Sequence, residues 1–302
     1  MPTRTVTAID PPRLASLPAV RDQLESSSRA IAFAFDGPRL LRAWGAPGRP
    51  WVVAIEDRGA RWTVEAWGAG PAEARRAARE IFSLEHPLEQ FYALVSREPV
   101  LRGTERRFRG LRLARDASVY EALLHAIIGQ QLSVRSARAI QLRLYEATGG
   151  SLDAGGIRVP RVPTPGELGS LSSDALRSIG LSRAKSEALR ALAGWARHRP
   201  PTAAALAAAP LSEAVELLDR LPGVGRWTAE NALLRGAGRR DVFVAGDLGV
   251  RAALADYGAV RRTQPENAAR AWAERHYPGW GGYATFYLWR KLVADRRAAA
   301  TG

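Results

Sequence analysis

The chain of 302 residues contains no cysteine and very few lysines and histidines. Without thiolates it can form neither disulfides, nor thiolate zinc sites, nor iron–sulfur clusters. The four histidines are scattered, so we expect no cofactor and no metal held by side chains: His86, His125, His198 and His276. Lys185 and Lys291 are the only lysines among 44 basic residues, so 42 are arginines and amine chemistry has few candidates.

Long apolar runs are absent as well. No stretch approaches the roughly 18 apolar residues that span a bilayer. The first residues, Met1-Pro2-Thr3-Arg4, lack the apolar core of a secretory signal. We therefore expect no membrane partner, and a cytoplasmic, nucleoid-associated location in a prokaryotic cell.

The charge is strongly one-sided, with a formal net charge of +14 and a pI near 11.1. Such a charge favours a polyanionic partner, because each neutralised phosphate releases counterions. A codon bias towards arginine, alanine and glycine would produce a similar composition. Charge alone therefore leaves both explanations open.

The pattern of the chain changes near residue 88. After a lead-in over 1–28, four strand-like runs are separated by turns that contain glycine or proline: 30–35, 39–44, 51–56 and 61–67. A helix is expected over 71–84. Beyond it helical spacing prevails, with a weak strand signal at 241–244. The sequence predicts an α+β protein, with a small antiparallel α/β domain over 1–88 and an all-α domain over 89–302.

A Pro-Gly-x-Gly turn lies between two helical segments, where residues 221–229 read LPGVGRWTA. Gly223 and Gly225 can take positive φ and let the backbone approach a ligand closely. The next helix starts at Arg226, and its first N–H groups are unpaired and suit a phosphate. An ordinary helix–turn–helix connection would have the same residues, so this pattern needs support from elsewhere.

Asp247 follows Gly225 by 22 residues and stands at the start of another helical pattern. Aspartate is a favoured N-cap, which is a sufficient structural reason for its presence. A carboxylate at a helix N-terminus also stays ionised and could stabilise positive charge on a sugar while an N-glycosidic bond breaks. It could equally orient the attacking water.

Two adjacent amides, Gln130 and Gln131, stand where a helix breaks at Gly129 and restarts after Ser133. Side chains on such a turn can enter a duplex. Aromatics gather near the C-terminus, and the helical spacing of Tyr283, Phe286 and Tyr287 indicates core packing for most of them. One or two aromatics are expected to line a pocket for a flipped base.

Together these motifs resemble the helix-hairpin-helix DNA glycosylase superfamily, and within it the AlkA-type 3-methyladenine DNA glycosylases. The resemblance covers about residues 110–295 and rests on 128–131, 221–229, Asp247 and 287–289. It implies hydrolysis of the bond between an alkylated base and its deoxyribose, with the nucleotide flipped out of double-stranded DNA. Bases similar to 3-methyladenine, ethenoadenine or hypoxanthine are the expected substrates, and we expect the protein to act as a monomer.

The resemblance also implies roles for single residues. Asp247 stands at the catalytic aspartate, Gln131 at the residue that plugs the emptied duplex position, and Gln130, Trp227 and Trp289 at the base pocket. The phosphate-binding hairpin comprises Leu221, Gly223, Gly225, Arg226 and Thr228. A monovalent cation is expected at the backbone of Leu221 and Val224.

Trp227 separates two mechanisms. Glycosylases that also cut the strand form a Schiff base through a lysine, and in those relatives the lysine occupies the position of Trp227. The chain is therefore expected to be monofunctional. Two features depart from the family, Asn231 in place of an aromatic and Gly281-Gly282 in place of an arginine. A non-enzymatic DNA-binding protein and a bifunctional glycosylase/lyase for oxidised purines are the alternatives.

Overall fold

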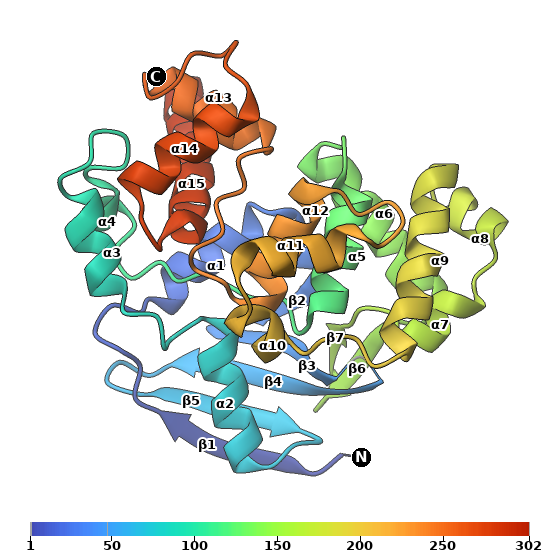
Figure 1. Ribbon diagram of the computed structural model, residues 1–302. Helices are drawn as coiled ribbons and strands as arrows, with labels where there is room; N and C mark the ends of the chain where they lie inside the picture. Colours follow the sequence, from blue (N-terminus) through green and yellow to red (C-terminus); the bar gives the residue numbers. More distant parts are fainter. Residues whose placement is uncertain (1, 47, 302) are drawn as a thin grey trace.

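A computed structural model describes residues 2–46 and 48–301, with side chains up to residue 299. One end of the molecule is a five-stranded antiparallel sheet, and helices occupy the rest (Figure 1). The strand order is β1-β5-β4-β3-β2, with β1 (Arg4–Ile9), β2 (Phe33–Asp36), β3 (Arg39–Ala46), β4 (Arg49–Asp57) and β5 (Trp62–Trp67). Helix α2 (Pro71–Ile81) packs across β1, β5 and β4. The predicted α+β class is confirmed.

The predicted lead-in is in fact structured. It contains β1 and helix α1 (Leu17–Glu25), which begins at the N-cap Ser16. β1 is an edge strand that pairs with β5, and only Ile9 of its six residues is buried, so its apolar signal is weak. Residues 30–32, predicted as strand, belong instead to the 3₁₀ helix η1 (Ser28–Ala32).

The two faces of the sheet meet different partners because alternate side chains of a strand point to opposite sides. Leu40, Val53 and Ile55 join the main core, which continues into the helices as far as Leu292. Leu41 and Val52 lie on the opposite face, where the hairpin of β6 (Ser151–Ala154) and β7 (Ile157–Pro160) covers them. A separate two-stranded sheet from the helical part of the chain thus covers the second face of the five-stranded sheet.

This β6–β7 hairpin corrects the prediction that residues 89–302 contain helices alone. Its two-residue turn is Gly155-Gly156, with φ of 67° and 91°. Positive φ at both turn residues gives the twist that a tight hairpin requires, and glycine adopts it without strain. Residues 241–244, the weak strand candidate, form no strand.

Helices follow the predicted segments, and short ones appear between them. The helices after α2 are α3 (Leu88–Val95), α4 (Thr104–Arg107), α5 (Val119–Gly129), α6 (Val134–Ala147), α7 (Pro165–Ser170), α8 (Ser173–Ser178), α9 (Arg183–Arg197), α10 (Ala203–Ala208), α11 (Leu211–Asp219), α12 (Arg226–Ala232), α13 (Leu248–Asp256), α14 (Glu266–His276) and α15 (Gly281–Thr301). Helix α12 continues as the π-helix η2 (Leu233–Ala237). Over 2–46 and 48–301, no helix combines the length and apolar character needed to cross a membrane.

The junction between α2 and α3 carries a half-buried imidazole. His86 places Nδ1 3.2 Å from the hydroxyl of Tyr283 in α15. Burial, together with the nearby positive charges of Arg115, Arg240 and Arg112, lowers the pKa of His86 from its ordinary 6.5 to about 4. The folded protein therefore resists protonation that the unfolded chain accepts.

This difference predicts a pH-dependent stability. Because the pKa of His86 is lower in the folded state, its contribution is fully present above pH 6.5 and is lost as the pH falls towards 4. Replacing the side chain (His86→Gln) should flatten this part of the curve of unfolding free energy against pH, measured by chemical denaturation. His198→Gln, at an exposed histidine, is the control. An unchanged slope in the His86 variant would contradict the assignment.

Candidate active site

The turn between α11 and α12, residues 221–225, is called the hairpin here, and it lies in the middle of the helical region (Figure 1). Gly223 has φ of 75°, and a Cβ there would lie 2.5 Å from Cβ of Ala188 in α9. Gly225 is the N-cap of α12 with φ of −97°, so the positive φ expected there is wrong. Both glycines are exposed, which leaves their backbone open to a ligand.

Most side chains in and after the hairpin pack against the protein or pair with other side chains. Leu221 is half-buried, and Val224 is buried. Thr228, predicted to bind phosphate, is buried with its hydroxyl engaged by Gln130, so only its backbone remains for that role. Arg226 is exposed and pairs at 3.0 Å with the buried Glu230, which Arg270 also contacts at 2.7 Å.

Asp247 is the N-cap of α13, as predicted, and its Oδ1 accepts the N–H of Val250 at 2.9 Å. The same oxygen accepts the indole N–H of Trp289 in α15 at 2.9 Å. Oδ2 accepts the indole N–H of Trp227 in α12 at 3.3 Å. The half-buried carboxylate is thus fixed by donors from three helices, two to Oδ1 and one to Oδ2.

The two indoles are therefore both beside the carboxylate, although they lie 62 residues apart in the sequence. Each is half-buried. Behind Trp289, the buried guanidinium of Arg235 lies 5.4 Å from the ring centroid and donates to the carbonyl of Ala114. Burial lowers the pKa of Arg235 to about 9. The sequence analysis missed Arg235, whose position in the π-helix η2 has no local sequence signal.

The break after α5 occurs at Gly129, as predicted, and residues 130–132 are called the wedge loop here. Gln131 is exposed with φ of 53°, a left-handed conformation rare for a residue with a side chain. Gln130 donates from Nε2 to the carbonyl of Gly223 and to the hydroxyl of Thr228, both at 2.9 Å. The structure therefore brings Gln130 to the hairpin.

Exposed apolar side chains lie next to Asp247 and next to the wedge loop. Leu248 follows the carboxylate directly and is 78% exposed. Leu132 and Val134, beside Gln131, are 37% and 55% exposed. The sequence analysis missed all three, since an apolar residue in a helical pattern is ordinarily taken for core. Isolated exposed apolar residues are common, but these border the site.

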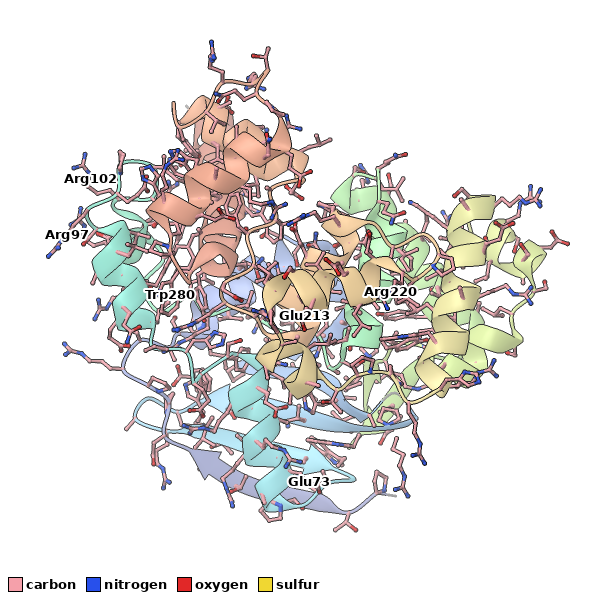
Figure 2. The ribbon with its side chains drawn as sticks, in the orientation of Figure 1. Glu73, Arg97, Arg102, Glu213, Arg220 and Trp280 are labelled. Atoms are coloured by element: carbon pink, nitrogen blue, oxygen red, sulfur yellow. The ribbon has the colours of Figure 1, made fainter. Side chains whose placement is uncertain are left out.

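The C-terminal aromatics lie in the core, as their spacing predicted. Tyr283, Phe286 and Tyr287 are fully buried, and Tyr287 meets Phe91 edge-on with ring centroids 4.9 Å apart. Trp280, labelled in Figure 2, is also buried. Trp289 is the member of this group that contacts Asp247 among the described residues.

The two departures from the family have local reasons. Asn231 is buried and donates from Nδ2 to the backbone carbonyl of Trp227 at 3.0 Å. It thereby fixes the backbone of the residue that carries the indole. A Cβ on Gly281 would lie 2.8 Å from the carbonyl oxygen of Asp241, and one on Gly282 2.8 Å from that of Arg239. The start of α15 packs too closely on this segment for larger residues.

Both lysines are engaged by neighbouring groups. Lys185 in α9 donates from Nζ to the carbonyls of Ile128 at 2.9 Å and Gln130 at 2.7 Å. Lys291 donates to Asp295 at 2.9 Å. Neither ammonium has a contact with Asp247 in the described part of the chain.

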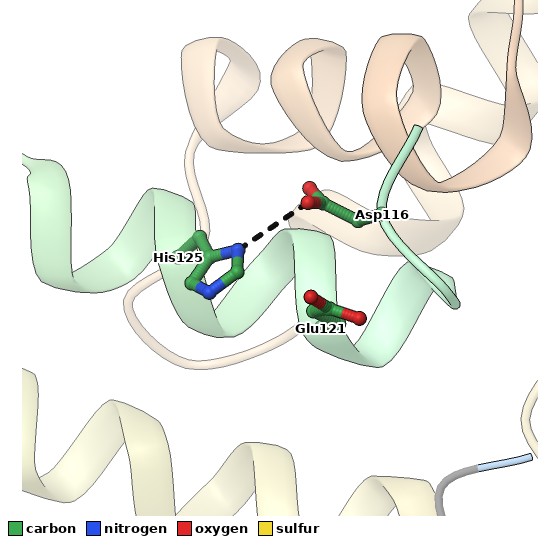
Figure 3. Close-up of side chains that lie close together, drawn as sticks. All are labelled: Asp116, Glu121 and His125. Atoms are coloured by element: carbon green, nitrogen blue, oxygen red, sulfur yellow. Dashed lines mark ion pairs between the residues drawn. The ribbon is translucent and has the colours of Figure 1, made fainter. Parts of the chain in front are cut away.

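Asp116, Glu121 and His125 form a buried group whose ligand atoms lie close enough for a metal (Figure 3). Their oxygens are already used, however. Arg29 donates to Asp116 at 3.0 Å, and Arg42 donates to Glu121 at 2.7 Å. The buried Arg42 and the half-buried Arg29 already pair with these two carboxylates, so this donor set does not fit a metal.

Comparison with known proteins agrees with this geometry. The HhH-GPD family, described as HhH-GPD superfamily base excision DNA repair protein, matches residues 124–278. The chain is similar to a DNA-3-methyladenine glycosylase of Bacillus subtilis (27% identity, 76% of this chain and 75% of that protein) and to DNA-3-methyladenine glycosylase 2 of Escherichia coli (31%, 60% of each). The solved 3-methyladenine DNA-glycosylase from Archaeoglobus fulgidus superposes with a TM-score of 0.81 at 25% identity, over 95% of this chain and 98% of that one.

The matched segment contains the features described above. It begins in α5 and includes the wedge loop, the hairpin and the carboxylate of Asp247. It spans half of the chain. The chain therefore belongs to the HhH-GPD superfamily of base excision DNA repair proteins.

Proposed function

We propose that this protein is a monofunctional DNA glycosylase that hydrolyses the N-glycosidic bond of alkylated bases after flipping the nucleotide out of the duplex. One observation carries the proposal: the carboxylate of Asp247 receives two indole N–H groups and a helix N-terminus, in the segment that also contains the hairpin. The names of the relatives, 3-methyladenine DNA glycosylases, support the same reaction.

The chemistry follows from the charge of the carboxylate. Positive charge develops on the deoxyribose as the base leaves, and a preorganised anion lowers the energy of that state. Because Trp227 and Trp289 hold both oxygens of Asp247, the anion needs little reorganisation during the reaction. The carboxylate can also accept a hydrogen bond from the attacking water.

Double-stranded DNA is the proposed partner. The exposed hairpin offers backbone N–H groups to one strand, with a monovalent cation proposed at the backbone of Leu221 and Val224. Exposed arginines stand on the flanking elements: Arg135 and Arg138 on α6, and Arg220 beside the hairpin, labelled in Figure 2. We also propose that the protein acts as a monomer and is located at the nucleoid.

The proposed substrates are 3-methyladenine and related lesions such as ethenoadenine and hypoxanthine. Half-buried Trp227 and Trp289 offer faces on which a flipped base can stack, and an electron-rich indole face attracts the cationic purines that alkylation produces. Gln131 is proposed to fill the emptied position in the duplex. Gln130, bound to the hairpin, would reach the pocket only through a change of its side-chain rotamer.

Replacing the carboxylate (Asp247→Asn) should lower base release by about two orders of magnitude or more, the scale for removing a preorganised electrostatic group. Asparagine keeps the N-cap, so the fold and DNA binding should persist. Single-turnover release of 3-methyladenine or ethenoadenine from a duplex measures the effect. Asp256→Asn, at the other end of α13, removes the same charge and should change little. Equal rates in wild type and the Asp247 variant would refute the role.

The hairpin is tested by Gly223→Ala, which places a Cβ 2.5 Å from Ala188 at a positive φ. Overpacking of this kind costs about 1–3 kcal/mol of unfolding free energy, and the displaced backbone should bind duplex DNA more weakly. In a Gly223→Ala background, Ala188→Gly should restore part of the stability. Gly225→Ala, whose Cβ meets nothing within 4 Å, should leave the melting temperature unchanged. Equal melting temperatures for the two alanine variants would contradict this account.

Strand cleavage gives a third test. A glycosylase/lyase forms a Schiff base that borohydride reduces to a covalent protein–DNA adduct. Since Lys185 and Lys291 are both bound to oxygens away from Asp247, we expect base release without such an adduct. An adduct that disappears in a variant of either lysine would favour the bifunctional alternative. Binding without base release from any lesion would favour the non-enzymatic one.

A further inference from the structure

One face of α9 supports two loops that are distant in sequence. Lys185 and Ala188 are three residues apart and therefore lie on the same side of the helix. Ala188 packs directly beneath Gly223 of the hairpin. Lys185 reaches the wedge loop through its ammonium group. The same helix face thus contacts the segment proposed to grip the backbone and the segment proposed to enter the duplex.

The Lys185 contact is specific in geometry. Nζ donates to the carbonyl of Ile128 at 2.9 Å and to that of Gln130 at 2.7 Å. Both acceptors belong to the end of α5, whose last carbonyls lack partners within the helix. A cation at a helix C-terminus is also favoured by the helix dipole. The half-buried ammonium therefore closes α5 and fixes the first residue of the wedge loop.

The wedge loop is tied to the hairpin by a second link. Gln130, whose carbonyl Lys185 holds, donates from its side chain to the carbonyl of Gly223 and to the hydroxyl of Thr228. The backbone carbonyl and the side chain of one residue are thus held by different partners. Gln131 follows immediately, with its left-handed φ of 53°. Hydrogen bonds from Lys185 to Gln130 and from Gln130 to Gly223 thus join the wedge loop to both α9 and the hairpin.

We propose that Lys185 is a positioning residue that holds the wedge loop against the hairpin and thereby sets the rate at which the damaged nucleotide leaves the duplex. The proposal rests on the proposed glycosylase function. When the hairpin binds phosphates of the DNA, Gln131 then takes a fixed position relative to the duplex. Without the lysine, the hairpin still binds DNA, but Gln131 loses its fixed direction.

The decisive comparison is Lys185→Met against Arg183→Met. Both remove one positive charge from the start of α9, but Arg183 is exposed and pairs with Glu187 on the same helix. Stopped-flow fluorescence of 2-aminopurine beside a lesion reports eversion of the nucleotide. Lys185→Met should slow eversion about tenfold, the scale of losing two hydrogen bonds, and Arg183→Met should not. Affinity for undamaged duplex should fall equally in both. Equal eversion rates in the two variants would overturn the proposal.

A double-mutant cycle tests the link itself. Gln130→Met breaks the contact to the hairpin, so Lys185→Met should add little further loss once that contact is gone. Additive losses would mean that the two residues act separately, and would overturn the proposed path.

A readout without substrate separates this proposal from the glycosylase function. In the DNA-free protein, amides of 129–133 should exchange hydrogen faster in Lys185→Met than in wild type, with no change in Arg183→Met. Unchanged protection in the loop, or loss of protection across the whole chain, would count against a positioning role. If wild type releases no base from any lesion, the proposed function fails, and the exchange result still decides whether Lys185 holds the loop.

Discussion

The geometry of the candidate site depends above all on the carboxylate of Asp247 and on the N–H groups that donate to it. An isolated N-cap would accept one backbone N–H and remain free to rotate. Here Trp227 and Trp289 add an indole N–H to each oxygen, from helices before and after α13. Each distance requires α12, α13 and α15 to pack in one particular way. The chemistry proposed for this carboxylate consequently depends on the tertiary structure, although Asp247 itself is recognisable in the sequence.

A second constraint joins the sheet to the helices. Arg29 and Arg42 come from the sheet end of the chain, and they meet Asp116 and Glu121 beside α5. Burial by itself would raise the pKa of Asp116, but the two arginines and His125 outweigh it and keep that pKa low. Loss of one partner from such a group costs about 3–5 kcal/mol, because a buried charge is left alone. The N-terminal sheet is therefore an integral support of α5 and of the wedge loop at its end.

Local signals in the sequence were sufficient to predict the hairpin, the N-cap at Asp247 and the break after α5. Glycine at Gly223, aspartate before α13 and the interruption at Gly129 each follow from backbone preferences of single residues. Long-range contacts had no such signal. The hydrogen bonds of Gln130 to the hairpin and of Trp289 to Asp247 join residues 93 and 42 positions apart. The β6–β7 hairpin did have a signal, Gly155-Gly156, which the prevailing helical pattern obscured.

The contact between Trp289 and Asp247 has a consequence for how the protein is made. The hairpin and the carboxylate leave the ribosome before α15, which carries the last donor. Until α15 docks, a nascent chain therefore lacks the indole donor of Trp289 and also the buried core residues Tyr283, Phe286 and Tyr287. Completion of the proposed active site therefore coincides with docking of α15, so a chain terminated within α15 would lack one donor to Asp247 as well as part of the core.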